Sequence, residues 1–454
     1  MERALTRCQM SGAFMPHVAL VAFTGFRIRE EAMRELGMSL PGLAPRAKAI
    51  AQLPALGLLT LAGLTPSHWE VSYHEASGAN DTETLAQQII DVRPALVAIS
   101  ALTASVEEAY AFSRLVRGAG IPVVIGGLHA TACPDEAADH CTAVVIGDGE
   151  PVWPLVLSDA EAGTLAPRYR AAKPWDLAEA PLPRFDLLGD AERPRYTLQT
   201  QRGCPLACDF CAASRLLGPF REKPLDKVTA ELKAIRERSP RPLIELADDN
   251  TFAGRRHPGA LFEGLADSGA RYFTEADWRI GERPDVLEGL ASSGCVQVLV
   301  GIEAIEPPFT GMGSKSAPMS RIIDAVEAIQ DTGVAVIACF VIGGDGESKA
   351  SIDRLGAFLE EAPCADLQLT LQTPFPGTAL HRRLARAGRL LPDRGWSHHT
   401  LFDLVYRPDR LSVEELETHF RDLVQRGFSA DALRRRNAIR RAVWARHPVL
   451  RNDK

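Results

Sequence analysis

Long apolar runs and an excess of positive charge are both missing from this 454-residue sequence. No stretch approaches the roughly 20 apolar residues that a membrane-spanning helix needs, so we expect no membrane span. The N-terminal stretch has early arginines but no continuous apolar segment with a small-residue cleavage site, which favours a cytoplasmic protein. The formal net charge of -7 argues against a general nucleic-acid binder, because such proteins are usually basic.

A disulfide pattern is missing as well. The nine cysteines are an odd number, and most of them are scattered along the chain, several in apolar surroundings. This usage is typical of a reducing compartment and not of a disulfide framework. The scattered cysteines are Cys8, Cys133, Cys141, Cys295, Cys339 and Cys364.

Two C-terminal segments stand out by composition. Residues 434–451, RRRNAIRRAVWARHPVLR, are strongly basic. We interpret them as a solvated terminal helix in preference to a nucleic-acid or membrane contact. Residues 395–404, GWSHHTLFDL, contain the paired histidines His398 and His399. This segment could fold over a substrate, but we favour two surface histidines.

The chain divides into two α/β units and a tail. The first unit, residues 15–160, alternates near-continuous Val/Ile runs with helical patterns, which indicates a parallel sheet covered on both faces. We predict a Rossmann-like doubly wound domain with its ligand crevice at the carboxyl ends of the strands. No G-x-G-x-x-G follows the first strand, so a dinucleotide is not favoured. The strands are expected at 17–23, 69–74, 95–100, 121–127 and 142–150.

The second unit follows a proline-rich, aperiodic stretch, residues 161–195, that we interpret as a linker. Residues 196–377 hold six strand-like runs alternating with helical patterns, which predicts a partial (β/α)6 TIM-like barrel. In such barrels the chemistry gathers at the C-terminal ends of the strands. Residues 378–454 indicate a helical tail. The barrel strands are expected at 196–201, 243–248, 271–278, 296–304, 334–344 and 367–375.

Three cysteines stand together in RGCPLACDFCAAS, residues 202–214, with the spacing C-x3-C-x2-C. They follow the first barrel strand, so Cys204, Cys208 and Cys211 should lie in a loop over the barrel mouth. A structural zinc site would normally have a fourth Cys or His at short range. Three thiolates instead suit a [4Fe-4S] cluster whose fourth iron is free to bind a substrate or cofactor. Zinc stays open as the alternative, which metal analysis would decide.

This motif, with an aromatic residue just before its last cysteine, resembles the radical S-adenosylmethionine (SAM) superfamily over roughly residues 196–375. The resemblance implies that SAM chelates the open iron and that reduction of the cluster cleaves SAM to a 5′-deoxyadenosyl radical. It implies that Glu303 contacts SAM and that the backbone of Gly343 and Gly344 passes the adenine. Glu303 could equally be a salt-bridged residue at the top of the barrel. Phe210 offers an aromatic shield beside the cluster.

Other polar residues at the strand ends are expected to face the substrate. Asp248, Asp249 and Asn250 follow the second barrel strand, and Glu275 lies in the third. Mixed charge at this mouth indicates a polar small molecule. Paired acids also bind Mg2+, but no phosphate loop accompanies these, so a magnesium site is disfavoured. The sequence assigns no catalytic residue.

A Rossmann-like domain ahead of this barrel resembles the cobalamin (B12)-binding subfamily of radical SAM enzymes, and residues 121–153 are similar to a segment of that subfamily. A D-x-H-x-x-G motif, whose histidine ligates cobalt in many cobalamin domains, is missing. The lower cobalt ligand is therefore unassigned, and loss of the cofactor from a retained fold stays open. The resemblance implies that the corrin or its tail faces Ser100, Gly126, Gly127, His129, Thr131, Gly147, Gly149 and Glu150.

Together, the two resemblances imply a cobalamin-dependent methyltransferase acting on an unactivated centre of a small molecule. An adenosyl radical would remove an unreactive hydrogen, and cobalamin would supply the methyl group. Flavodoxin or ferredoxin is the expected electron donor. Other radical chemistry stays open: cyclisation, rearrangement, oxidation or aminocarboxypropyl transfer. A non-catalytic iron–sulfur or cobalamin-sensing protein is a further alternative.

Overall fold

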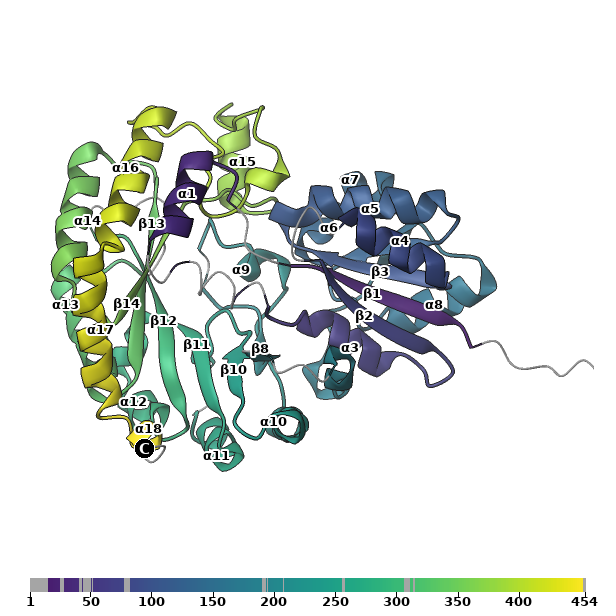
Figure 1. The fold of residues 1–454 in the computed structure, drawn as a ribbon, viewed down its shortest axis with the longest axis horizontal. Helices are drawn as coiled ribbons and strands as arrows, with labels where there is room; N and C mark the ends of the chain where they lie inside the picture. The colour runs from purple at the N-terminus through teal and green to yellow at the C-terminus, as the bar shows by residue number, and fades with distance from the viewer. Residues whose placement is uncertain are drawn as a thin grey trace, which may run out of the picture.

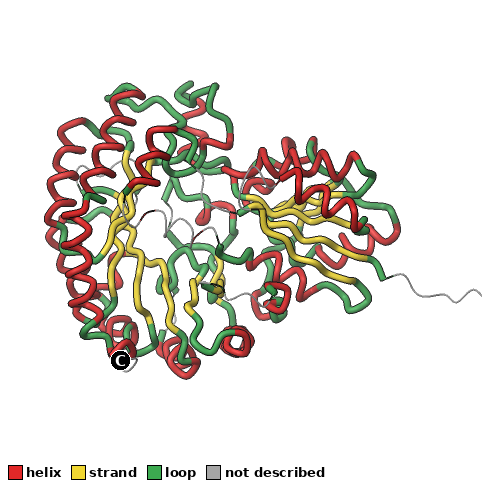
Figure 2. The backbone as a smooth tube through the Cα atoms, viewed as in Figure 1, coloured by secondary structure: helices red, strands yellow, loops and turns green. Residues whose placement is uncertain are grey.

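Two parallel six-stranded sheets, each with alternating helices, make up most of the molecule (Figure 1). Figure 2 shows helices on both faces of the smaller sheet and along the outer side of the larger one. The computed structural model describes residues 15–451 except 25–27, 41–42, 44–49, 51, 77–81, 190–192, 194, 207, 255–257, 306–310 and 313–314.

The smaller, N-terminal sheet has the order β2-β1-β3-β4-β5-β6, and all neighbouring strands are parallel. Alternate residues of β1 enter two different cores: Val18 and Leu20 lie in one, Ala19 and Val21 in the other. Both faces are thus buried, which explains the near-continuous apolar strands and confirms the Rossmann-like prediction. The elements are β1 His17–Phe23, α1 Glu31–Ser39, α3 Leu56–Leu64, β2 Glu70–Ala76, α4 Thr82–Val92, β3 Leu96–Ala101, α5 Val106–Gly118, β4 Val123–Gly126, α6 Leu128–Ala132, α7 Pro134–Asp139, β5 Ala143–Ile146, α8 Trp153–Ala162 and β6 Arg168–Arg170.

Two segments differ from the boundaries that the sequence suggests. Strand β6 lies inside the expected linker but pairs with β5, so it completes the N-terminal sheet. Helix α1 belongs by sequence to the first unit, yet Met33 lies in the barrel core and α1 lies beside α16 of the tail (Figure 1). An amphipathic pattern marks a buried face but does not say which core receives it.

The larger sheet has the order β14-β13-β12-β11-β10-β7 with parallel pairing, as expected for an open six-stranded barrel. A separate two-stranded antiparallel ribbon, β8-β9, follows its first strand. The elements are β7 Tyr196–Leu198, β8 Gln201–Arg202, α9 Ala213–Leu216, β9 Arg221–Glu222, α10 Leu225–Arg238, β10 Leu243–Leu246, α11 Gly259–Ser268, β11 Arg271–Asp277, α12 Pro284–Leu290, β12 Cys295–Glu303, α13 Met319–Asp331, β13 Ala335–Ile342, α14 Lys349–Glu361 and β14 Asp366–Leu371.

The tail is helical, as expected, and packs on the barrel: α15 Ala379–Arg386, α16 Val413–Gly427, α17 Ala430–Trp444 and α18 Pro448–Arg451. Leu416 and Phe420 of α16 join the barrel core. The basic helix α17 is not simply solvated, because Arg436 is buried and Trp444 donates a hydrogen bond to the Val296 carbonyl. Neither these helices nor any other helix in the described residues is long and apolar enough to cross a bilayer.

The carboxyl ends of the N-terminal strands point toward the barrel domain (Figure 1). The helix α6, which follows β4, lies against α9, and the loop after β5 contacts β8. Because α9 and β8 flank the three-cysteine motif, the predicted ligand edge of one domain lies next to the predicted metal loop of the other.

Candidate active site

The three cysteines lie in a loop, residues 203–220, whose two ends are joined by the β8-β9 ribbon; we name this segment the cluster loop. Gly203 at its start has a φ of 80°, and a Cβ there would come 3.0 Å from the Gly218 carbonyl oxygen. The closed base therefore requires glycine at this position. Cys208 is buried, while Cys204 and Cys211 are partly exposed.

The thiols converge on one another. Burial raises the pKa of Cys208 to about 11, and the nearby thiols of Cys211 and Cys204 add to the rise against an opposing effect of Lys315. Among the described residues, the triad whose possible ligand atoms all lie within 4.8 Å of one another is His129, Cys133 and Glu136. The three thiols of the cluster loop do not form such a triad in the described residues. Three such thiols fit a [4Fe-4S] cluster with one iron left open.

Asp248 and Asn250 connect β10 to the cluster loop. The carboxylate of Asp248 is buried and accepts hydrogen bonds from the backbone amides of Thr200 (2.8 Å) and Gln201 (3.1 Å). The side-chain amide of Asn250 points at the sulfur of Cys204, 4.0 Å away. Asp248 therefore holds the segment directly before the cluster loop, Asn250 approaches the loop itself, and the contact of both residues with a substrate stays a prediction.

Asp209, directly after Cys208, connects the cluster loop to the tail. Its carboxylate pairs with Arg383 of α15, and its carbonyl accepts a hydrogen bond from the Leu380 amide at 3.0 Å. The Asp209 amide in turn donates to the Gly311 carbonyl at 3.1 Å. Sequence reasoning missed Asp209 and Arg383, since a pair 174 residues apart leaves no local pattern.

Glu303 ends β12 in the left-handed region, with a φ of 71°, which is uncommon for a residue other than glycine. Its carboxylate pairs with Lys315 at 2.6 Å, and both side chains are largely buried. The salt-bridged alternative is thus what this structure shows, and contact with SAM stays a prediction. Sequence reasoning missed Lys315, whose one signal is an isolated cation 12 residues after Glu303.

Gly343 and Gly344 follow β13 and are both buried. Gly343 has a φ of 100°, and a Cβ there would come 2.6 Å from the hydroxyl oxygen of Tyr406. That hydroxyl donates a hydrogen bond to the Gly343 carbonyl. The segment is therefore held closely by the tail in a conformation that glycine permits, and its role beside adenine stays a prediction.

The predicted corrin residues gather at the carboxyl edge of the N-terminal sheet. Ser100 pairs with Gly126, and a Cβ on Gly127 would lie 3.4 Å from the Ser100 hydroxyl oxygen. The hydroxyl of Thr131 accepts a hydrogen bond from the Gly147 amide at 3.0 Å. Small residues and positive-φ glycines at this edge leave room for a bulky ligand to approach the backbone. Leu102, just beyond β3, is 58% exposed and adds an apolar surface there.

His129 lies under the tail. Its Nδ1 is 3.3 Å from the Thr103 hydroxyl, and its ring packs edge-on against Trp396. Trp396 donates a hydrogen bond to Glu136 and packs against His399. His399 is buried, so the preference for two surface histidines was wrong for this one, and burial lowers its pKa to about 4.

Two acids of the barrel interior have raised pKa values. Burial, followed by the nearby Asp248 carboxylate, raises the pKa of Asp249 to about 6. Burial, followed by Glu245 and Asp249, raises the pKa of Glu275 to about 7. Their contact with polar substrate groups stays a prediction.

The Glu275→Gln substitution tests this environment. A raised folded-state pKa means that the neutral carboxyl favours folding below the ordinary pKa of 4.5, and that this contribution is lost as the pH rises through about 7. Glutamine cannot ionise. We therefore expect the variant's free energy of unfolding, taken relative to the parent, to be about 1–3 kcal/mol higher at pH 8 than at pH 5. Urea unfolding midpoints at both pH values measure this gain. An equal difference between variant and parent at both pH values would contradict it.

Family comparisons agree with the two-part architecture. Residues 43–157 match the B12 binding domain, and residues 198–359 match the Radical SAM superfamily. This chain joins a B12-binding domain to a radical SAM domain. The matches support the three expected cofactors: a [4Fe-4S] cluster and SAM in the barrel, and cobalamin in the N-terminal domain.

One curated relative matches almost end to end. The bacteriochlorophyllide d C-12(1)-methyltransferase of Chlorobaculum tepidum is 26% identical over 399 residues, which cover 86% of each chain. The similarity therefore includes both the B12-binding domain and the radical SAM domain.

Two solved structures share the arrangement of the domains. The radical enzyme OxsB with aqua-cobalamin and SAM bound has a TM-score of 0.66 at 13% identity; the match covers 89% of this chain and 66% of that one. The methyltransferase TsrM of Kitasatospora setae, with cobalamin and a [4Fe-4S] cluster bound, has a TM-score of 0.62 at 15% identity, covering 90% and 82%. At these identities the likeness shows the fold.

Proposed function

We propose that this chain is a cobalamin-dependent radical SAM methyltransferase that methylates an unactivated carbon of a small molecule. The observation that carries the proposal is the contact between the base of the cluster loop and the carboxyl edge of the N-terminal sheet. Arg202, directly before the cluster loop, pairs with Asp148 in the loop after β5 of the B12-binding domain. A site for hydrogen abstraction at the cluster loop and a site for a methyl donor in the B12-binding domain would then be neighbours. The Chlorobaculum tepidum relative, which matches over 86% of the chain, is named as a methyltransferase, and this name supports the proposed function.

When bound, the cluster with SAM supplies a hydrogen-abstracting radical, and cobalamin supplies a methyl group. The chain's own part is positioning. Cys204, Cys208 and Cys211 would hold three irons, and the Glu303 carboxylate would meet the cationic part of SAM. The open backbone beside Gly127 and the other small residues of that sheet edge would receive the corrin.

The partners follow from the same chemistry. Asp249 and Glu275 would hold a polar group of the substrate inside the barrel, where their raised pKa values allow either protonation state near neutral pH. Reduced flavodoxin or ferredoxin would deliver the electron that the cluster needs. The odd number and scattered positions of the cysteines suit a cytoplasmic location.

Anaerobic reconstitution with iron, sulfide and hydroxocobalamin, followed by reduction in the presence of SAM, tests the proposed function. We expect cobalt to stay with the chain and the reaction to yield 5′-deoxyadenosine together with S-adenosylhomocysteine. Chromatography with mass spectrometry measures both products. The Cys208→Ala variant is the control, because it should form no 5′-deoxyadenosine.

The product pattern separates the other radical reactions. 5′-Deoxyadenosine without S-adenosylhomocysteine would indicate hydrogen abstraction without methyl transfer. Methylthioadenosine would indicate aminocarboxypropyl transfer. A corrin that never stays bound would overturn the methyl-transfer proposal, and no SAM cleavage by a loaded, reduced cluster would favour a non-catalytic protein.

A further inference from the structure

The base of the cluster loop places two like charges opposite each other. In the antiparallel β8-β9 ribbon, Arg202 faces Arg221 directly. Like charges at directly opposed positions destabilise a strand pair. Both side chains are 13–14% exposed, so solvent screens their repulsion only in part. The ribbon therefore needs negative charge from elsewhere.

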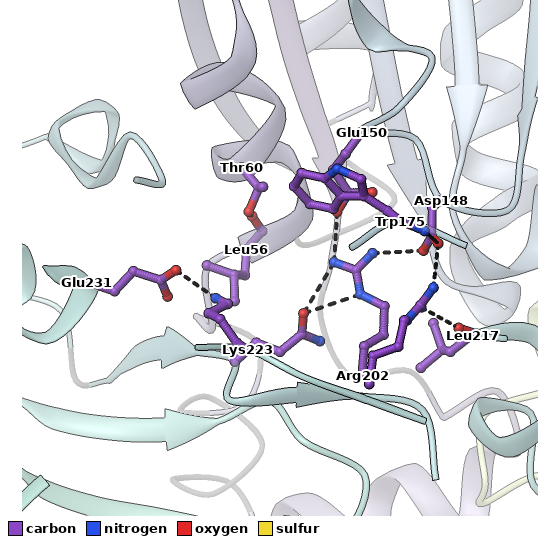
Figure 3. Close-up of polar contacts among 11 residues, drawn as sticks. Leu56, Thr60, Asp148, Glu150, Trp175, Arg202, Leu217, Lys223 and Glu231 are labelled. Atoms are coloured by element: carbon purple, nitrogen blue, oxygen red, sulfur yellow. Dashed lines mark hydrogen bonds and ion pairs between the residues drawn. The ribbon is translucent and has the colours of Figure 1, made fainter. Parts of the chain in front are cut away.

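That charge comes from the other domain. Asp148, in the loop after β5, accepts from Arg202 Nη1 through Oδ1 at 2.8 Å and from Arg221 Nη1 through Oδ2 at 2.9 Å (Figure 3). Glu150 accepts from Arg202 Nη2 at 2.7 Å. The two acids are 11% and 6% exposed, so the network is enclosed. Two guanidinium groups and two carboxylates balance in charge.

The linker completes the network. The backbone amide of Trp175 donates to Asp148 Oδ2 at 2.9 Å, and the Arg202 guanidinium lies 6.0 Å from the centre of the Trp175 ring. Burial by itself would raise the pKa of Asp148, but the Trp175 amide and Arg202 outweigh it and hold that pKa below its ordinary value. The Asp148 carboxylate is thus kept ionised between its two partners.

We propose that Asp148, Glu150, Arg202 and Arg221 form a latch that fixes the B12-binding domain on the base of the cluster loop. Asp148 and Glu150 are then positioning residues of the barrel loop, and the expectation that Glu150 faces the corrin is replaced by this role. The carboxylate of Asp148 binds both strands of the ribbon, through Arg202 and Arg221. Opening the domain interface would remove this carboxylate and leave the two arginines to repel each other. Docking of the domain and closure of the loop are therefore coupled.

The latch has a consequence for the reaction, and this consequence rests on the proposed function. It fixes the distance between the methyl donor and the radical source, because one end of the latch is two residues from Cys204 and the other follows β5. Without the latch, SAM cleavage should continue while its coupling to methyl transfer falls. The latch itself does not depend on which reaction the site performs.

Hydrogen exchange with small-angle scattering tests the latch on the full, reconstituted chain. The variant is Asp148→Asn with Glu150→Gln, which keeps shape and removes both charges. We expect amide exchange in residues 201–223 to rise at least about tenfold, since two buried arginines lose their partners. We also expect a larger radius of gyration. Asp148→Glu with Glu150 intact should restore much of the protection.

The control is Glu231→Gln, which breaks a different buried pair in the same region (Figure 3). Lys223 and Glu231 lie 2.6 Å apart and are 5% and 2% exposed, but both belong to the barrel domain. This variant should lower thermal stability and leave the radius of gyration unchanged. Parent-like exchange in 201–223 and a parent-like radius in the double variant would overturn the latch. The result stands whether or not methyl transfer is observed, so it separates failure of the latch from failure of the proposed function.

Discussion

Replacing Cys204, Cys208 or Cys211 by alanine, one at a time, is expected to abolish the cluster's visible absorbance and the formation of 5′-deoxyadenosine together. Each thiolate is expected to hold one iron, so the loss of one ligand opens a second iron and the cluster is not retained. Iron and sulfide counts, the absorbance spectrum and product chromatography of anaerobically reconstituted protein measure the effect. We expect a loss of activity to background in all three variants.

Cys295→Ala and Cys339→Ala are the matched controls. Both cysteines are buried within barrel strands, β12 and β13, away from the cluster loop in sequence. Their substitution should leave iron content and SAM cleavage at the level of the parent. A cluster-loop variant that kept both signals would show that the three cysteines do not act as one site.

Glu303→Gln is expected to weaken SAM binding by at least about tenfold while the iron content stays at the parent level. The carboxylate is largely buried, belongs to a residue with a positive φ and lies 2.6 Å from Lys315, so its position is fixed. A carboxylate can accept hydrogen bonds from more than one donor, so it can bind SAM beside Lys315. Replacing a charge-assisted bond by a neutral one costs about 1.5–3 kcal/mol. Equilibrium dialysis with labelled SAM measures the affinity.

Glu282→Gln is the control for this prediction. Glu282 also pairs with a cation, Arg321, but on the surface, where an ion pair contributes little. SAM affinity should therefore match the parent. Equal affinity in Glu303→Gln and the parent would mean that the Glu303–Lys315 pair is structural only.

The cluster motif and the positions of the strands along the chain were predictable because their signals are local. The three cysteines lie within one short loop, and the strand of each βα unit is marked by its own apolar run. The six barrel strands and the first five strands of the N-terminal sheet are found where the sequence indicates them. Strand β6 was missed because three residues are too few to show a period.

Contacts between distant segments were not predictable in the same way. Asp148 and Arg221 are 73 residues apart, and Asp209 and Arg383 are 174 apart, so only the folded chain reveals these pairs. Residues 147–150, GDGE, illustrate the limit. The resemblance implied that Gly147, Gly149 and Glu150 face the corrin, whereas the structure directs the carboxylates of Asp148 and Glu150 at Arg202. Residue type indicated a functional loop, but the partner of each side chain depends on how the domains dock.

Electron paramagnetic resonance of the reduced chain, with and without SAM labelled with 17O in its carboxylate, tests the central claim most directly. The account predicts a [4Fe-4S] signal that changes on addition of SAM and broadens with the label, because the iron without a protein ligand binds the SAM carboxylate. A signal that SAM leaves unchanged, or a chain that holds zinc and no iron, would contradict the account.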